Sequence, residues 1–252
     1  AKVKALGVDM VFGPVLDVTG DRTGVIGDRS FSADPMVVAE YGQAYADGLR
    51  DAGILPVLKH FPGHGRTTTD SHLELPLIEH PPERLRDVEL LPFKAAIAAD
   101  VATIMTAHIL LPALDEERPA TLSRHVVTRM LREDLGYQGV ILSDDLEMKA
   151  IARDYQVPAA AVLAVEAGCD GVLICSGDWE AQAASLEALI YAVESGRLSY
   201  ARVEDALTRQ RRAKERFLAG EPARRPATLK SLRQVLGQDA HLMIADEMAR
   251  FA

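Results

Sequence analysis

The sequence has few cysteines, few aromatic residues and no long apolar run. Its longest apolar stretches, such as GVLIC at 171–175, are far shorter than the roughly 20 residues that cross a bilayer, so we expect no membrane segment. The opening string AKVKALGVD lacks the layout of a signal peptide. The composition is that of an ordinary globular protein, with 48% hydrophobic and 26% charged residues, and a cytoplasmic location is our expectation.

The two cysteines, Cys169 and Cys175, are too far apart to pair if the string CDGVLIC forms a strand. Six residues of strand span about 20 Å, whereas a disulfide needs Cα atoms within about 7 Å of each other. We therefore predict two free, buried thiols, which suit a reducing compartment.

The chain also lacks an excess of basic residues, since its formal net charge is −9. Binding to a phosphate backbone needs a basic surface, so we expect no nucleic-acid partner. A neutral sugar would not be repelled by this charge. The length of 252 residues suits one large domain, or one domain with a short extension.

Five short apolar segments predict β-strands: 9–15, 54–59, 102–108, 138–143 and 170–175. They are almost wholly apolar rather than alternating, which is typical of a parallel sheet covered on both faces. Longer helical patterns fill the intervals between them. This alternation predicts right-handed βαβ units.

Helical patterns are present at 35–52, 83–99, 124–135, 158–167, 179–195 and 200–219. Pro92 is expected to split the second of these helices. A linker rich in proline and arginine follows at 221–228, with short helices near 229–236 and 238–250. We predict a TIM-type (β/α)₈ barrel domain over 1–220 and a helical extension over 221–252. A complete barrel has eight strands, so five strands suggest that the first ones are missing.

Polar side chains gather where three predicted strands end. Lys59 and His60 close the second strand, His108 the third, and Asp144 with Asp145 the fourth. Active sites of parallel α/β folds lie at the carboxyl ends of the strands. Lys59 and His60 could bind substrate hydroxyls, although a salt bridge and a satisfied core histidine would give the same pattern.

The loop KHFPGHGRTTTDSHLELP, residues 59–76, is long and rich in glycine, proline and threonine, which favours a functional loop. Asp70 and His72 are two residues apart, so in extended backbone their side chains point to the same side. Asp70 could then orient His72 and raise its basicity, which predicts an acid/base pair. An Asx-turn beside a solvated histidine is the structural alternative.

Asp144 directly follows the apolar string GVILS, where a carboxylate could be a nucleophile, a base or a metal ligand. The alternative is a helix N-cap for residues 146–151, a role that Asp145 could also take. We expect one of Asp144 and Asp145 to have a catalytic or binding role and the other a structural role. Arg29 could make forked contacts to a sugar or pair with an acidic neighbour.

Together these segments resemble family 3 glycoside hydrolases, specifically the bacterial β-N-acetylglucosaminidase (β-N-acetylhexosaminidase) branch. The matching strings are FGPVLDV (12–18), IGDRSF (26–31), KHFPGHGRTTTDSH (59–72), TAHI (106–109), PATLS (119–123), LREDLGYQGVILSDDLEM (131–148) and AGCDGVLIC (167–175). The resemblance covers roughly residues 5–220. The loop string is its most specific part, since the β-glucosidase branch lacks the Asp-Ser-His pair there.

The resemblance implies a role for each site residue: Asp144 as nucleophile, His72 as acid/base with Asp70 as its partner, and Lys59, His60 and Arg29 as ligands of the terminal sugar. It implies retaining hydrolysis of β-linked N-acetylglucosamine, with cell-wall (peptidoglycan) fragments as substrates and no cofactor or metal. A histidine in place of a carboxylate also admits phosphate as acceptor, so phosphorolysis is a variant.

The sequence departs from the family in one respect. Members carry an earlier strand that ends in a DQEGGR-type string, whose aspartate binds the sugar, and this string is absent. We therefore expect a missing N-terminal segment, a second domain or another partner. Two further alternatives stay open: a non-catalytic sugar-binding fragment, and a metal-dependent hydrolase with zinc held by residues such as His60, His64, Asp70, His72 and Asp144.

Overall fold

The computed structural model describes residues 2–21, 24–65, 67, 71, 74–218 and 228–250. Its strands are β1 (Met10–Val11), β2 (Leu55–Pro56), β3 (Leu58–Phe61), β4 (Thr103–Thr106), β5 (Val140–Asp145) and β6 (Gly171–Leu173). β1 pairs with β2, and β3, β4, β5 and β6 form a second sheet in that order. Every named pair is parallel, as the βαβ alternation predicts.

Each of the five predicted strand segments contains a strand, and the segment 54–59 divides into β2 and the start of β3. The division does not interrupt the layer. Val15 forms a parallel bridge with Lys59, and the Leu16 N–H donates to the Lys59 carbonyl at 2.6 Å. The first segment therefore lies beside the second along its length, and the described strands form one continuous parallel layer.

The helices follow the predicted intervals closely. They are α1 (Lys2–Ala5), η1 (Gly27–Arg29), α2 (Pro35–Asp51), α3 (Pro82–Arg84), η2 (Leu85–Glu89), α4 (Leu91–Ala98), η3 (Ala120–Leu122), η4 (His125–Asp134), α5 (Lys149–Ala152), α6 (Val157–Ala167), α7 (Trp179–Glu194) and α8 (Tyr200–Leu218). The predicted break near Pro92 is confirmed, since Pro92 lies in the first turn of α4. There its missing N–H costs no helical hydrogen bond.

The sheet is apolar on both faces, as the unbroken apolar strands predict. Ile104 and Ile141 point into a large core with Phe93 of α4. Their neighbours Met105 and Leu142 point to the opposite face and join a smaller cluster that includes Ala213 of α8. Successive strand residues face opposite sides, so helices pack against both faces of one layer.

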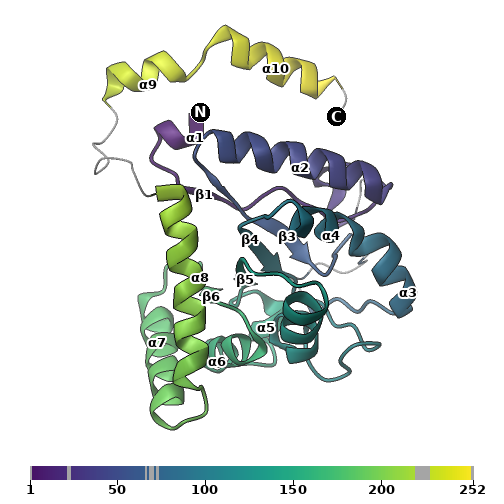
Figure 1. Ribbon diagram of the computed structural model, residues 1–252, viewed down its shortest axis with the longest axis vertical. Coiled ribbons are helices and arrows are strands. Elements are labelled where there is room, and N and C mark those ends of the chain that lie inside the picture. The colour runs from purple at the N-terminus through teal and green to yellow at the C-terminus, as the bar shows by residue number, and fades with distance from the viewer. Residues whose placement is uncertain are drawn as a thin grey trace.

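The last helices, α9 (Leu229–Val235) and α10 (Asp239–Ala249), correspond to the short helices predicted near 229–236 and 238–250. Figure 1 shows them as an arm that runs past α1 and α2, away from α7 and α8. They have no buried residue of their own. None of the described helices is long and apolar enough to cross a membrane.

One prediction about the cysteines is wrong. Cys169 is buried, and burial raises the pKa of its thiol to about 12. Cys175, however, is exposed, because β6 ends at Leu173 and the chain has already left the layer. Both cysteines are free, as predicted.

Candidate active site

The carboxyl ends of β3 and β5 bring the predicted polar residues to one edge of the layer. His60 lies on β3 and Asp144 on β5, with β4 between the two strands. Nε2 of His60 lies 3.9 Å from Oδ2 of Asp144. Two residues that are 84 positions apart in the sequence therefore face each other across the strand ends, where the sequence places an active site.

A third residue, which the sequence reasoning missed, completes this row. Asp17 has no exposed surface, and its Oδ2 lies 2.7 Å from Nδ1 of His60. Its Oδ1 accepts from the backbone N–H groups of His60 at 3.3 Å and His64 at 2.6 Å. Only acceptor oxygens can take these contacts, so Asp17 fixes His60 with Nδ1 protonated and Nε2 turned toward Asp144.

The charge state of Asp17 agrees with this role. Burial alone would raise the pKa of its carboxyl, but the charge and hydrogen bond of His60, together with His64, hold the pKa below its ordinary value. Asp17 is therefore ionised at neutral pH. The signal that could have found it is the one that found Asp144, an aspartate after an apolar strand, here in FGPVLDV.

Lys59 and Arg29 bring positive charge to the same place. Burial lowers the pKa of Lys59, the carboxylate of Asp144 opposes that change, and Arg29 adds to it. Arg29 itself donates to the carbonyl oxygens of Val25 at 2.9 Å and Ile26 at 3.3 Å. These contacts are with the backbone just before η1 and not with an acidic neighbour, and they use Nε and one of the two terminal nitrogens of the guanidinium.

The two consecutive aspartates differ in their contacts. Asp145 accepts backbone N–H groups from Glu147 and Cys175, both at 3.2 Å, and so secures the turn after β5. Asp144 has 21% of its side chain exposed. The N-cap alternative is wrong for both, since α5 begins at Lys149. Asp145 therefore has the structural role, whereas Asp144 keeps a partly exposed carboxylate that a ligand can reach.

His108 is also placed at this edge, but as a buried structural residue. Its Nδ1 lies 2.8 Å from the Thr121 hydroxyl, and its Nε2 lies 2.9 Å from the Asp145 carbonyl oxygen. Burial lowers the pKa of His108, so the neutral ring is favoured. Both ring nitrogens are in use, which makes His108 a support for the backbone beside Asp144 rather than a ligand group.

The functional loop leaves β3 and packs closely on the segment that carries Asp17. A Cβ on Gly65 would lie 2.4 Å from the Val18 carbonyl oxygen, so only glycine fits this approach. Asp70 and His72, the predicted acid/base pair, lie outside the described residues, and their predicted roles stay predictions.

Three of the residues considered for zinc, His60, His64 and Asp144, belong to the described part of the chain. That part contains no group of three or more His, Cys, Asp or Glu side chains arranged to hold a metal. Both ring nitrogens of His64 have hydroxyl partners, so His64 has no nitrogen free for a metal in this arrangement.

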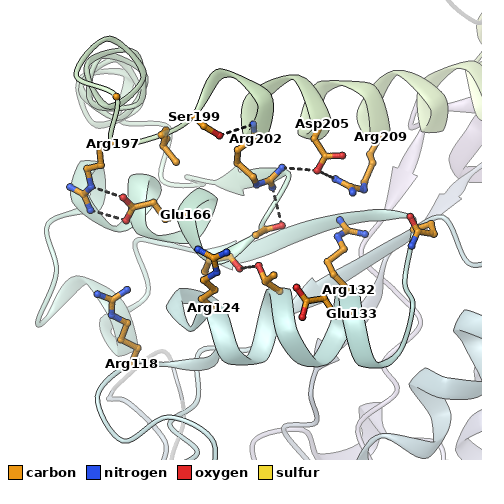
Figure 2. A pocket seen from close by; sticks show the side chains of 16 residues that line it. Arg118, Arg124, Arg132, Glu133, Glu166, Arg197, Ser199, Arg202, Asp205 and Arg209 are labelled. Carbon is orange, nitrogen blue, oxygen red and sulfur yellow. Dashed lines mark hydrogen bonds and ion pairs between the residues drawn. The ribbon is translucent and has the colours of Figure 1, made fainter.

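A second charged cluster lies at the opposite end of the strands. Asp170 directly precedes β6, and its carboxylate is ion-paired with Arg132, Arg202 and Arg209. These arginines line a pocket of about 680 Å³ between η4 and α8, shown in Figure 2. The Asp170 carboxylate also accepts the N–H of Ile141, near the start of β5, so the cluster connects β5 with η4 and α8. Asp144 lies near the other end of β5, away from this cluster.

Comparison with known proteins adds three findings. The model for the glycosyl hydrolase family 3 N terminal domain matches residues 1–213. A beta-hexosaminidase from Alkalilimnicola ehrlichii is 43% identical over 176 residues, 70% of this chain and 50% of that protein. Another, from Methylococcus capsulatus, is 45% identical over 191 residues, 75% of this chain and 56% of that protein.

Among solved structures, a glycoside hydrolase family 3 beta-N-acetylglucosaminidase from Paenibacillus sp. is similar, with a TM-score of 0.89 and 43% identity. The match covers 94% of this chain and 45% of that one. The fold is therefore the TIM-type α/β fold. The chain spans about half the length of the curated relatives it matches.

Proposed function

The chain belongs to glycosyl hydrolase family 3, and from this membership we propose that it carries the site of a retaining enzyme that removes terminal β-linked N-acetylglucosamine. The observation that carries the proposal is the row Asp17–His60–Asp144 at the strand ends. The relatives named beta-hexosaminidase and beta-N-acetylglucosaminidase supply the substrate class.

Asp144 acts as the nucleophile in this proposal. It is the partly exposed carboxylate of the row, and its Oδ1 accepts the N–H of Asp145 at 2.8 Å, which leaves Oδ2 toward His60. A carboxylate fixed in this way can attack the anomeric carbon of a bound sugar. The product of that step is a glycosyl ester of Asp144, and retention of the β-configuration follows from its hydrolysis.

Lys59, His60 and Arg29 bind the terminal sugar in the proposal. The Lys59 ammonium makes no hydrogen bond or ion pair with another described residue, so its donors are free for hydroxyl groups. His72, oriented by Asp70, protonates the leaving oxygen in the first step and activates water in the second. Cell-wall fragments are the substrates we propose, and the two free cysteines suit a cytoplasmic location.

Turnover of an aryl N-acetyl-β-glucosaminide by the complete protein tests the proposal. We expect Asp144→Ala and His72→Ala to lower kcat by at least about 10³-fold, since each removes one of two interdependent catalytic groups. A mechanism-based fluorosugar that keeps the 2-acetamido group should leave an adduct on Asp144 in the wild type. A folded, sugar-binding protein with neither turnover nor adduct would contradict the proposal and favour the non-catalytic alternative.

Two control arms separate the remaining alternatives. Addition of phosphate distinguishes hydrolysis from phosphorolysis, because phosphorolysis yields the sugar 1-phosphate and requires phosphate for turnover. A chelator tests the metal-dependent alternative, since we expect activity to survive exhaustive chelation. Asp145→Asn controls for general damage beside Asp144: it should lower stability more than it lowers kcat.

A further inference from the structure

Ser71 is the described residue closest in the chain to the predicted acid/base pair, since it lies between Asp70 and His72. It is buried. Its hydroxyl lies 3.2 Å from Nε2 of His64. Its carbonyl oxygen accepts a 3.1 Å hydrogen bond from the N–H of Ala150, in the helix that follows the strand of Asp144. Ser71 is thus held from two sides.

The hydroxyl of Thr67 fixes the direction of the hydrogen bonds at His64. This hydroxyl has one proton and lies 3.1 Å from the His64 carbonyl oxygen, which can only accept. Once the proton is donated there, the Thr67 oxygen accepts from Nδ1 of His64, which is 2.6 Å away. Nε2 of the neutral ring then carries a lone pair, and the Ser71 hydroxyl donates to it.

The environment of His64 supports this neutral ring and its fixed position. Burial lowers the pKa of His64, so the ring is uncharged at neutral pH. Its backbone N–H donates to Asp17, the same carboxylate that orients His60 beside Asp144. One buried group therefore fixes both the surroundings of the nucleophile and the base of the loop.

We propose that the hydrogen bond between Ser71 and His64 positions the acid/base residue His72 relative to Asp144. The inference rests on the proposed function and adds two positioning residues to it. Neither side chain is free to touch substrate, because Ser71 is buried and both His64 nitrogens are occupied. Covalent connection carries the effect, since Ser71 is the immediate neighbour of His72.

Leaving-group dependence separates positioning of the acid from general damage. The dinitrophenolate leaving group of a dinitrophenyl N-acetyl-β-glucosaminide departs with little protonation. Departure of methylumbelliferone from the corresponding glycoside depends more on the general acid. In the complete protein, we expect Ser71→Ala to lower kcat/KM, which reports formation of the glycosyl ester, about tenfold with the methylumbelliferyl substrate, the effect of one lost hydrogen bond. With the dinitrophenyl substrate kcat/KM should change less than about twofold.

A double-mutant cycle and a matched control complete the experiment. His64→Gln should show the same selectivity, and the double variant should lose no more than the worse single variant, because both disrupt one interaction. Ser71→Thr, which keeps the hydroxyl, should restore turnover if Ser71→Ala lowers folding yield. Ser185→Ala, a buried serine of α7 bonded to a helix carbonyl, should leave both substrates unchanged.

The outcomes distinguish this inference from the proposed function. Wild-type turnover of either substrate tests the function alone. Equal loss on both substrates in a folded Ser71→Ala protein, or no loss on either, would overturn the positioning role while leaving the function intact.

Discussion

Asp17 is fully buried, yet three polar contacts converge on it from His60 and His64. We predict that Asp17→Asn lowers kcat by at least about 10²-fold, because an amide nitrogen can donate and would favour the wrong tautomer of His60. KM should change less than kcat. Steady-state kinetics of the complete protein measure both, with circular dichroism to confirm folding. A variant with wild-type kcat would remove Asp17 from the site.

His64 and His108 predict how stability depends on pH. Burial lowers the pKa of each ring below the ordinary value near 6.5. Below that pH the unfolded chain binds more protons than the folded one, so the free energy of unfolding falls as pH drops from 7 toward 5. His108→Gln should flatten this slope in urea unfolding. Asp17 contributes little in this window, because its lowered pKa in the folded chain and the ordinary aspartate pKa of about 3.9 in the unfolded chain both lie below pH 5.

Sequence reasoning identified single residues where a local signal existed. Asp144 is a predicted site residue because it follows an apolar strand, whereas Asp17 is not among the predicted residues although it follows an apolar segment too. The structural partners of His64 could not be predicted, since they depend on how the loop folds back on itself. A division of labour between Asp144 and Asp145 was anticipated, but only their contacts in the folded chain assign the structural role to Asp145.

At the scale of elements, the close approach of the loop to the Asp17 segment gives a third prediction. Gly65→Ala would place a Cβ 2.4 Å from the Val18 carbonyl oxygen, so one of the two backbones must move. We expect a loss of about 1–3 kcal/mol in the free energy of unfolding together with a lower kcat. Denaturant unfolding and kinetics of the same preparation measure the two effects.

Gly48→Ala is the matched control. Gly48 lies within α2, and a Cβ there meets no atom within 4 Å. Alanine should stabilise the helix by about 0.5–1 kcal/mol without changing kcat. If Gly65→Ala behaved in the same way, the loop would not depend on its contact with Val18.

Elements were predictable because each has a local cause. Apolar runs mark the strands, and glycines with positive φ, such as Gly53 and Gly136, lie just after the ends of α2 and η4. The division of segment 54–59 into β2 and β3 was not predictable, because it depends on pairing with two different partners, Met10–Val11 and β4. Strand pairing is a property of tertiary structure that periodicity does not encode.

At the scale of the whole molecule, two ends of one layer serve different purposes. The carboxyl ends of the strands carry the proposed site, and the amino ends carry the Asp170 cluster. No sequence pattern predicted this cluster, because its partners come from η4 and α8, more than 30 residues away on either side. The Asp170 cluster lies outside the proposed site, so we expect its ion pairs to affect stability and not catalysis.

The Asp170 cluster leads to a prediction that separates stability from activity. The side chain of Asp170 is inaccessible to solvent and pairs with Arg132, Arg202 and Arg209. Asp170→Ala would leave these partly buried arginines without their shared carboxylate, so we expect a loss of about 3–5 kcal/mol in the free energy of unfolding. KM for an aryl N-acetyl-β-glucosaminide should stay unchanged at temperatures where the variant is folded.

Glu166→Ala provides the comparison within the same pocket, as Figure 2 shows. Glu166 makes a bidentate ion pair with Arg197, whose Nε and Nη2 lie 2.6 and 2.9 Å from the two carboxylate oxygens. The side chain of Arg197 is, however, 51% exposed. Solvent screens such a pair, so its loss should cost at most about 1 kcal/mol. Urea unfolding of both variants compares the two losses of stability, and equal destabilisation would mean that burial of Asp170 does not set the strength of the cluster. A raised KM in Asp170→Ala would mean that the two ends of the layer are coupled.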